Sequence, residues 1–220
     1  MTACATRLAV FDCDGTLVDG QADICRAMDS AFAALGLIAP DHHLVRRAVG
    51  LSLPRTMRHL APDLDERTRG ELTELYKQAF RTARAEGTLA EPLFPGMAQL
   101  LDDMRQAGWL LGVATGKSDM GLQHCLATHG LTDHFTTLQT ADRHPSKPHP
   151  AMLEAALDEA GAQPEDAVMI GDTAFDIIMA VDTGVRAIGV GWGYHDEYEL
   201  REAGACGVAA TPAAIMELLR

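Results

Sequence analysis

The sequence AVFDCDGTLVD, at residues 9–19, is the strongest indication of both fold and chemistry in this chain. Its apolar beginning, with Leu8 before it, is typical of a short buried β-strand. This strand delivers two carboxylates, Asp12 and Asp14, to its C-terminal end, where Gly15 allows a sharp turn. Two acids one residue apart can share a hard cation or divide the roles of nucleophile and proton donor. The alternative interpretation is a β-hairpin, because Asp-Gly between apolar flanks is a strong hairpin signal.

The next segment, residues 20–87, is expected to be entirely helical. Apolar residues recur at helical spacing in residues 21–36, and further helices are predicted at 41–49, 53–61 and roughly 64–86. No run typical of a strand occurs here. A crossing rich in proline and glycine, residues 91–96, then leads into a different architecture.

From residue 97 onward, helices alternate with short apolar strands. Strands are predicted at residues 109–114, near 135–140, at 167–171 and at 185–190, and a last helix–strand–helix closes the chain. This alternation implies a mostly parallel sheet with helices on both faces. The expected fold class is therefore α/β, with a Rossmann-like parallel-sheet core that is interrupted by the helical segment.

Polar residues at the carboxyl ends of parallel strands are candidates for a binding site. After the second strand, Thr115 and Gly116 can offer a hydroxyl and backbone N–H groups to an anion. Lys147 stands among prolines after the third strand, and the fourth strand ends in Asp172, four residues before Asp176. Each has an ordinary alternative: a helix N-cap with a turn glycine, a surface lysine, and an N-cap followed by an acid in the first helical turn.

Taken together, these groups resemble the four motifs of the haloacid dehalogenase-like hydrolase superfamily, and the resemblance extends over nearly the whole chain. The matching residues are 12–16, Thr115, Lys147 and 171–176. Residues 20–87 resemble that superfamily's helical cap, inserted in a core of residues 1–19 and 88–220. Residues 91–96, 147–150 and 191–195 resemble its phosphoglycolate phosphatase-like branch. In this superfamily a small hairpin follows the acid loop, so the hairpin and the functional interpretations are compatible.

The resemblance implies a Mg²⁺-dependent phosphatase that hydrolyses a small phosphomonoester, similar to phosphoglycolate, through an aspartyl-phosphate. Asp12 is then the nucleophile, and Asp14 the general acid and base. The phosphate oxygens are expected to be bound by Thr115, Gly116 and Lys147.

The Mg²⁺ ligands implied by the resemblance are Asp12, the backbone carbonyl of Asp14, and Asp172, with Asp176 supporting them. Dehalogenases of this superfamily lack an acid at the position of Asp14, which favours phosphate chemistry over carbon–halogen cleavage. A sugar phosphomutase uses the same residues and stays an alternative. A non-catalytic binding module is a further one, disfavoured because every motif acid is present.

Substrate selectivity is expected to come from the helical segment. Four arginines flank a non-helical break at residues 50–54: Arg46, Arg47, Arg55 and Arg58. One or two of them, with Arg55 as the candidate for the site, are predicted to bind a carboxylate of the substrate, since arginine does so bidentately. For any single one, solvated helix surface is the alternative.

Composition limits the partners of the protein. With 18 basic and 31 acidic residues, the formal net charge is −13, which argues against binding to nucleic acid or anionic membranes. A phosphate ligand then needs a local positive site or a bound metal. No apolar run approaches membrane-spanning length and no secretion signal is evident, so a cytoplasmic monomer or homodimer acting on a small phosphorylated metabolite is expected. Five scattered cysteines are expected to be free thiols, with Cys13 a small apolar filler: Cys4, Cys13, Cys25, Cys125 and Cys206.

Overall fold

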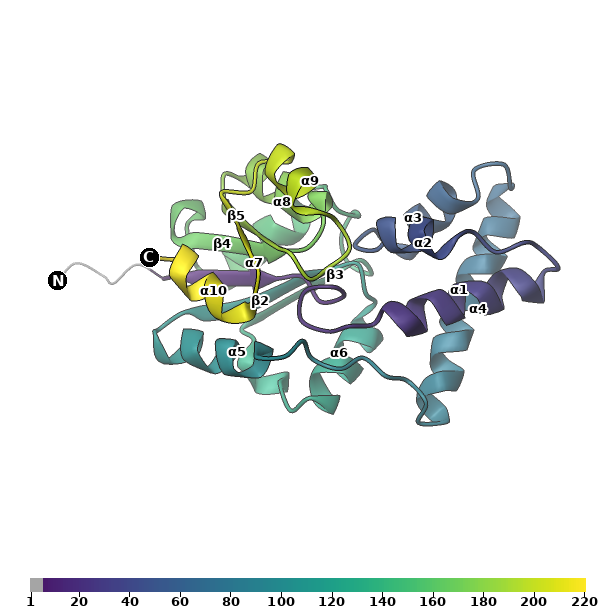
Figure 1. Ribbon diagram of the computed structural model, residues 1–220, viewed down its shortest axis with the longest axis horizontal. Coiled ribbons are helices and arrows are strands. Elements are labelled where there is room, and N and C mark those ends of the chain that lie inside the picture. The colour runs from purple at the N-terminus through teal and green to yellow at the C-terminus, as the bar shows by residue number, and fades with distance from the viewer. Residues whose placement is uncertain (1–5) are drawn as a thin grey trace.

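The computed structural model of the protein describes residues 6–220. Its centre is a six-stranded sheet in the order β3-β2-β1-β4-β5-β6, in which all paired strands are parallel (Figure 1). The strands are β1 (Leu8–Phe11), β2 (Leu110–Thr115), β3 (Thr137–Thr140), β4 (Ala167–Gly171), β5 (Arg186–Val190) and β6 (Gly207–Ala209). The strand order reverses between β1 and β4, and ligands bind at the carboxyl ends of strands at such a switch point.

Helices cover both faces of this sheet, as the alternating sequence predicts. Neighbouring residues of β1 point to opposite faces, so Ala9 and Phe11 join one hydrophobic cluster while Leu8 and Val10 join the other. The first cluster includes α5 (Met97–Gln106), α6 (Asp119–Thr128) and α10 (Pro212–Leu218). The second includes α7 (Ala151–Ala160), α8 (Ala174–Thr183) and α9 (Glu197–Glu202). The expected α/β class is confirmed.

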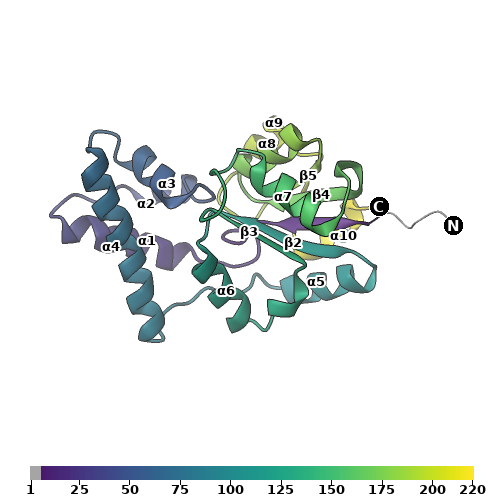
Figure 2. The ribbon, with the colours of Figure 1, turned by 180° about the vertical axis from the view of Figure 1, so that it is seen from behind.

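Four further helices lie together beyond the carboxyl ends of the strands (Figures 1 and 2). They are α1 (Gln21–Ala34), α2 (His42–Arg47), α3 (Leu53–Leu60) and α4 (Glu66–Ala85). Their apolar faces form a hydrophobic cluster of their own, with Met28, Met57 and Leu72 nearly inaccessible to solvent. An inserted helical unit with its own core is therefore present, and it faces the edge of the sheet where the polar strand ends gather.

Two chain crossings join the helical unit to the sheet, and they lie side by side. The acid loop closes on itself through a bond from the Gly15 amide to the Val18 carbonyl, at 2.9 Å. Beyond this turn, the Asp19 amide donates to the Pro92 carbonyl at 2.8 Å, and the Phe94 amide donates to the Leu17 carbonyl at 3.0 Å. The turn indicated by Asp-Gly thus exists, and it aligns both crossings beside the acids.

The described thiols are all free. Cys13, Cys25 and Cys125 are buried and Cys206 is exposed, whereas Cys4 lies outside the described residues. The Cys13 Sγ lies 3.9 Å from the Cys125 Sγ under the acid loop. The hydrogen bond between these two thiols and the burial of Cys13 raise its pKa. Cys13 therefore fills space in the core and is no nucleophile. Among residues 6–220, no helix combines the length and apolar character needed to cross a membrane.

Candidate active site

Asp12 occupies the position directly after β1, at the middle of the sheet. Its backbone amide donates to the Ile170 carbonyl at 2.9 Å, and its side chain is 1% exposed. The Oδ1 atom accepts from the Cys13 amide at 2.6 Å and lies 2.9 Å from the Lys147 Nζ. The buried Oδ2 atom has no hydrogen-bond partner among the described residues. One oxygen is thus anchored, while the other is available to a reacting atom or a cation.

Lys147 is completely buried between two acids. Its Nζ donates to the Asp176 Oδ1 at 2.6 Å in addition to its ion pair with Asp12. Burial by itself lowers the pKa of a lysine, but here the two carboxylates outweigh it and raise the pKa of Lys147. Lys147 is therefore a permanently charged group inside the site and no surface lysine.

The start of α8 fixes Asp176 and corrects one detail of the sequence interpretation. The N-cap residue is Thr173, not Asp172, because Thr173 has an extended backbone and forms a capping box with Asp176. The Asp176 Oδ2 accepts from the Thr173 amide at 3.1 Å and from its hydroxyl at 2.7 Å. Asp172 precedes the helix and instead turns its side chain towards the acid loop.

Asp172 completes a cluster of three buried carboxylates. Its Oδ1 accepts from the Thr16 hydroxyl at 2.8 Å and its Oδ2 from the Tyr194 amide at 2.9 Å. One carboxylate oxygen from each of Asp12, Asp172 and Asp176 lies within 4.8 Å of the other two. Burial raises the pKa of Asp172, and repulsion from the other two carboxylates raises it further.

This cluster has the composition of a divalent-cation site. Three carboxylates face a single lysine, so two negative charges stay uncompensated if all are ionised. Burial raises the pKa of Asp12 to about 7 in spite of Lys147. The free Asp12 Oδ2 and the all-oxygen donor set fit a hard cation such as Mg²⁺, which removes this excess charge.

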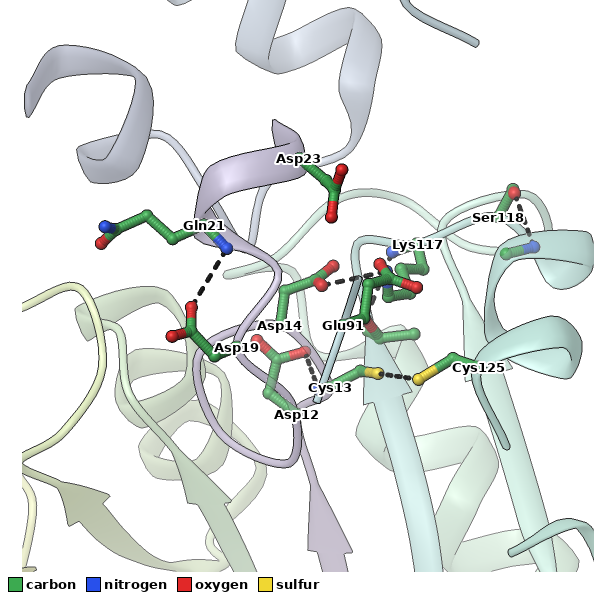
Figure 3. Close-up of polar contacts among 12 residues, drawn as sticks. Asp12, Cys13, Asp14, Asp19, Gln21, Asp23, Glu91, Lys117, Ser118 and Cys125 are labelled. Carbon is green, nitrogen blue, oxygen red and sulfur yellow. Dashed lines mark hydrogen bonds and ion pairs between the residues drawn. The ribbon is translucent and has the colours of Figure 1, made fainter. Parts of the chain in front are cut away.

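Asp14 belongs to a second ionic group, which sequence reasoning missed (Figure 3). The Lys117 Nζ lies 2.9 Å from the Asp14 Oδ1 and donates to the Glu91 Oε1 at 2.6 Å. All three side chains are mostly buried, with exposed fractions of 13% for Asp14, 10% for Lys117 and 6% for Glu91. Burial raises the pKa of Asp14, Lys117 opposes this, and Glu91 adds to it. The carboxyl group of Asp14 thus keeps its proton to a higher pH than an ordinary aspartic acid.

Thr115 is the last residue of β2, and Gly116 follows it at the boundary with the helical unit. Thr115 is buried, and its hydroxyl accepts from the Lys117 amide at 3.2 Å. The N-cap of α6 is Ser118, so Thr115 has no capping role. A Cβ atom at Gly116 would lie only 2.6 Å from the Leu51 carbonyl oxygen. Glycine therefore lets the break at residues 50–54 contact the end of β2.

Other contacts also hold the helical unit against the sheet. The Ser52 amide donates to the Ser146 hydroxyl at 2.7 Å, and Arg47 pairs with Glu199. His195 accepts from the Ala174 amide at 3.1 Å through Nδ1, and its Nε2 faces the Arg47 carbonyl at 3.3 Å. Burial lowers the pKa of His195, so a neutral imidazole packs between the two parts of the molecule.

A cavity of about 380 Å³ lies between the helical unit and the sheet. Asp14, Thr115 and Lys117 are in its wall, which connects it to the ionic groups described above. Arg46, Arg47, Arg55 and Arg58 are not in this wall; Arg55 lies 3.5 Å from the Lys147 carbonyl, and Arg58 pairs with Glu66 at 3.0 Å. The basic residues that line the cavity from the helical unit are Lys77, Arg81 and Arg84 of α4.

The chain matches known proteins along most of its length. Residues 9–190 match the family model for haloacid dehalogenase-like hydrolases. A Dickeya dadantii protein named "Probable phosphatase IndB" is 34% identical over 203 residues, which are 89% of this chain and 86% of that protein. The phosphoglycolate phosphatase of Vibrio vulnificus is 29% identical over 203 residues, 89% of this chain and 88% of the enzyme. A haloacid dehalogenase-like hydrolase from Streptococcus pneumoniae has a solved structure with a TM-score of 0.85 and 25% identity, covering 98% of this chain and 99% of that one.

Proposed function

Because the chain belongs to the haloacid dehalogenase-like hydrolase family, we propose that it is a Mg²⁺-dependent phosphatase that acts through an aspartyl-phosphate on a small phosphorylated metabolite. The observation that carries this proposal is that the Asp12 Oδ2 is buried and has no hydrogen-bond partner, while Asp12 lies next to Lys147 and Asp172. The names of the relatives, a probable phosphatase and a phosphoglycolate phosphatase, support the same reaction class.

In the first step, the Asp12 Oδ2 forms a bond to phosphorus while the bond from phosphorus to the leaving oxygen breaks. The electron pair of that bond goes to the leaving oxygen, which takes the proton of Asp14. In the second step, a water molecule gives a proton to Asp14 and attacks phosphorus, which releases inorganic phosphate and restores the Asp12 carboxylate. The raised pKa of Asp14 suits this exchange, because the group must hold a proton at the start of the cycle.

The remaining residues hold the phosphate and the metal. Lys147, the Thr115 hydroxyl and the Gly116 amide are the donors proposed for the phosphate oxygens. The Mg²⁺ ligands proposed are Asp12, Asp172 and the Asp14 carbonyl, while Asp176 holds Lys147. When bound, Mg²⁺ neutralises negative charge between the nucleophile and the phosphate. We further propose residues 20–87 as a cap on a core of residues 1–19 and 88–220.

The experiment that tests this function is an assay of phosphomonoesters with the purified protein in Mg²⁺. We expect inorganic phosphate in an amount equal to the alcohol released. Isomerisation of a sugar phosphate without phosphate release would support a phosphomutase instead. Absence of both activities over a broad panel would contradict an enzymatic role.

Metal removal should abolish activity and change the stability of the protein with pH. In the absence of metal, the pKa of Asp12 rises from 3.8 to about 7 on folding, so the folded state binds more protons in this interval. Stability should therefore fall as pH rises from about 4 to about 7, and Mg²⁺ should offset this loss. Calorimetry with EDTA or Mg²⁺ at pH 5 and pH 8 checks this; a larger Mg²⁺-induced rise in Tm at pH 5 than at pH 8 would contradict it.

Lys117 and Glu91 should shift the pH dependence in opposite directions. Lys117→Met removes the charge that lowers the pKa of Asp14, so the alkaline limb of kcat/KM should move to higher pH. Glu91→Gln removes a charge that raises this pKa and should move the limb down. The limbs are measured with an alkyl phosphate, whose leaving oxygen needs the proton of Asp14. If both variants shifted the limb in the same direction, the charges of Lys117 and Glu91 would not control the pKa of Asp14.

A further inference from the structure

The cavity beside Asp14 is larger and more apolar than a two-carbon substrate needs. Its volume of about 380 Å³ lies in the range of about 300–1,000 Å³ that is typical of sites for drug-sized ligands. The apolar side chains that the helical unit contributes to its wall include Ile24, Met28, Val49, Leu53, Tyr76 and Phe80. Phosphoglycolate has no group that could cover these side chains.

One face of α4 gives this cavity an aromatic section. Tyr76 and Phe80 are four residues apart and therefore lie on the same face of the helix. Their ring centroids are 5.1 Å apart, with an angle of 41° between the planes. Both rings line the same cavity as Asp14, the proposed proton donor. An apolar leaving group that occupies this cavity can therefore pack against the two rings.

Two arginines further along α4, Arg81 and Arg84, also line the cavity and have no acidic partners. Arg81 donates only to the Gln78 side chain, at 3.0 and 3.2 Å, and the buried Nε of Arg84 has no acceptor among the described residues. Other arginines of α4 do have carboxylate partners: Arg67 pairs with Glu71, and Arg69 with Glu66. Two guanidinium groups without carboxylate partners in the wall of a cavity, in a protein with a net charge of −13, indicate an anionic ligand.

The spacing along α4 separates the two kinds of contact. From Tyr76 to Arg84, eight residues at the helical rise span about 12 Å along the axis. A substrate that contacts both Tyr76 and Arg84 therefore needs a spacer along this face of α4. A ring or a chain of similar length provides one and covers the apolar wall at the same time.

We propose that the substrate is an amphipathic phosphomonoester, whose leaving group has an apolar body of about ring size and a second anionic group at its far end. The apolar body packs against Met28, Tyr76 and Phe80, and the anionic group binds Arg81 and Arg84. This inference rests on the proposed phosphatase function and names the substrate class for the same site.

Three phosphomonoesters test this substrate class: phosphoglycolate, phenyl phosphate and 4-(carboxymethyl)phenyl phosphate. We expect the last to have the highest kcat/KM, since it alone has both the ring and the distant carboxylate. Arg84→Gln should lower its kcat/KM about 10-fold while leaving phenyl phosphate unchanged, the scale of one lost recognition contact. Phe80→Ala should lower both aryl substrates about 10-fold and leave phosphoglycolate unchanged.

Two controls keep these outcomes separable. Arg67→Gln changes an arginine of the same helix whose side chain is 89% exposed, and it should affect none of the substrates. Phe80→Leu keeps an apolar side chain and serves if Phe80→Ala does not fold. Equal effects of Arg84→Gln and the Phe80 variants on all three substrates, or no effect on any, would overturn the substrate class while leaving the phosphatase function intact. No phosphate release by the wild-type protein in Mg²⁺ from any of the three, or from the broad panel of phosphomonoesters, would contradict the proposed function itself.

Discussion

Asp12→Asn should remove turnover, with a loss of kcat on the order of 10⁶-fold, the scale that follows removal of the nucleophile from a covalent mechanism. The amide cannot attack phosphorus as a carboxylate oxygen does, and it replaces the buried, partner-free Oδ2 of the acid that pairs with Lys147. The measurement is the rate of phosphate release at saturating substrate in Mg²⁺.

Stability measurements distinguish this loss from misfolding. Asp12→Asn removes one of three clustered buried carboxylates, so the metal-free variant should unfold at a Tm equal to or above that of the metal-free wild type. Asp14→Asn should retain more activity, with a loss of about 10²–10⁴-fold, the usual contribution of general acid–base catalysis. A folded Asp12→Asn protein with wild-type kcat would exclude the covalent mechanism.

Lys147→Met should be the most destabilising substitution in the site. The ammonium group is completely buried and holds the Asp12 Oδ1 at 2.9 Å and the Asp176 Oδ1 at 2.6 Å. Without it, two carboxylates in the interior lack their compensating charge, and breaking a buried ion pair in this way costs about 3–5 kcal/mol. The free energy of unfolding in urea, measured without metal, checks this value.

A second substitution and a control lysine sharpen this measurement. Adding Asp176→Asn to Lys147→Met removes one uncompensated charge and should restore part of the lost stability. Lys77→Met changes a partly exposed lysine that pairs with Glu74 on α4, and it should have little effect. If Lys147→Met unfolded at the same urea concentration as the wild type, Lys147 would not be the charge that stabilises these acids.

The elements of the fold are predictable because their signals are local. The alternation of Leu8 to Phe11 between two hydrophobic clusters follows from the period of a strand. Carboxyl ends of parallel strands meet at one edge, so the convergence of Asp12, Asp172 and Lys147 follows from their positions after strands. The alternative that made Asp172 the N-cap of α8 is wrong, because Thr173 is the N-cap, and the backbone conformation that decides this cannot be read from the sequence.

The groups that sequence reasoning missed depend on tertiary packing. Glu91 and Lys117 are far apart in the chain, and they meet only because the second crossing lies beside the end of β2. The sequence interpretation selected four arginines because they flank the non-helical break at residues 50–54: Arg46, Arg47, Arg55 and Arg58. The arginines in the cavity wall are Arg81 and Arg84, because the packing of α4 turns that face towards the sheet. The sequence pattern of α4 alone does not specify how this helix is rotated about its axis relative to the sheet.

Covalent phosphate on Asp12 is the most direct measurement of the proposed mechanism. Asp14→Asn is mixed with 4-nitrophenyl phosphate in Mg²⁺ and quenched in acid, because 4-nitrophenolate leaves without a proton while hydrolysis of the acyl phosphate still needs Asp14. Peptide mass spectrometry should then find phosphate on the peptide that contains Asp12, and none in Asp12→Asn. Release of 4-nitrophenolate with no phosphate on this peptide, or with phosphate on another residue, would contradict nucleophilic attack by Asp12.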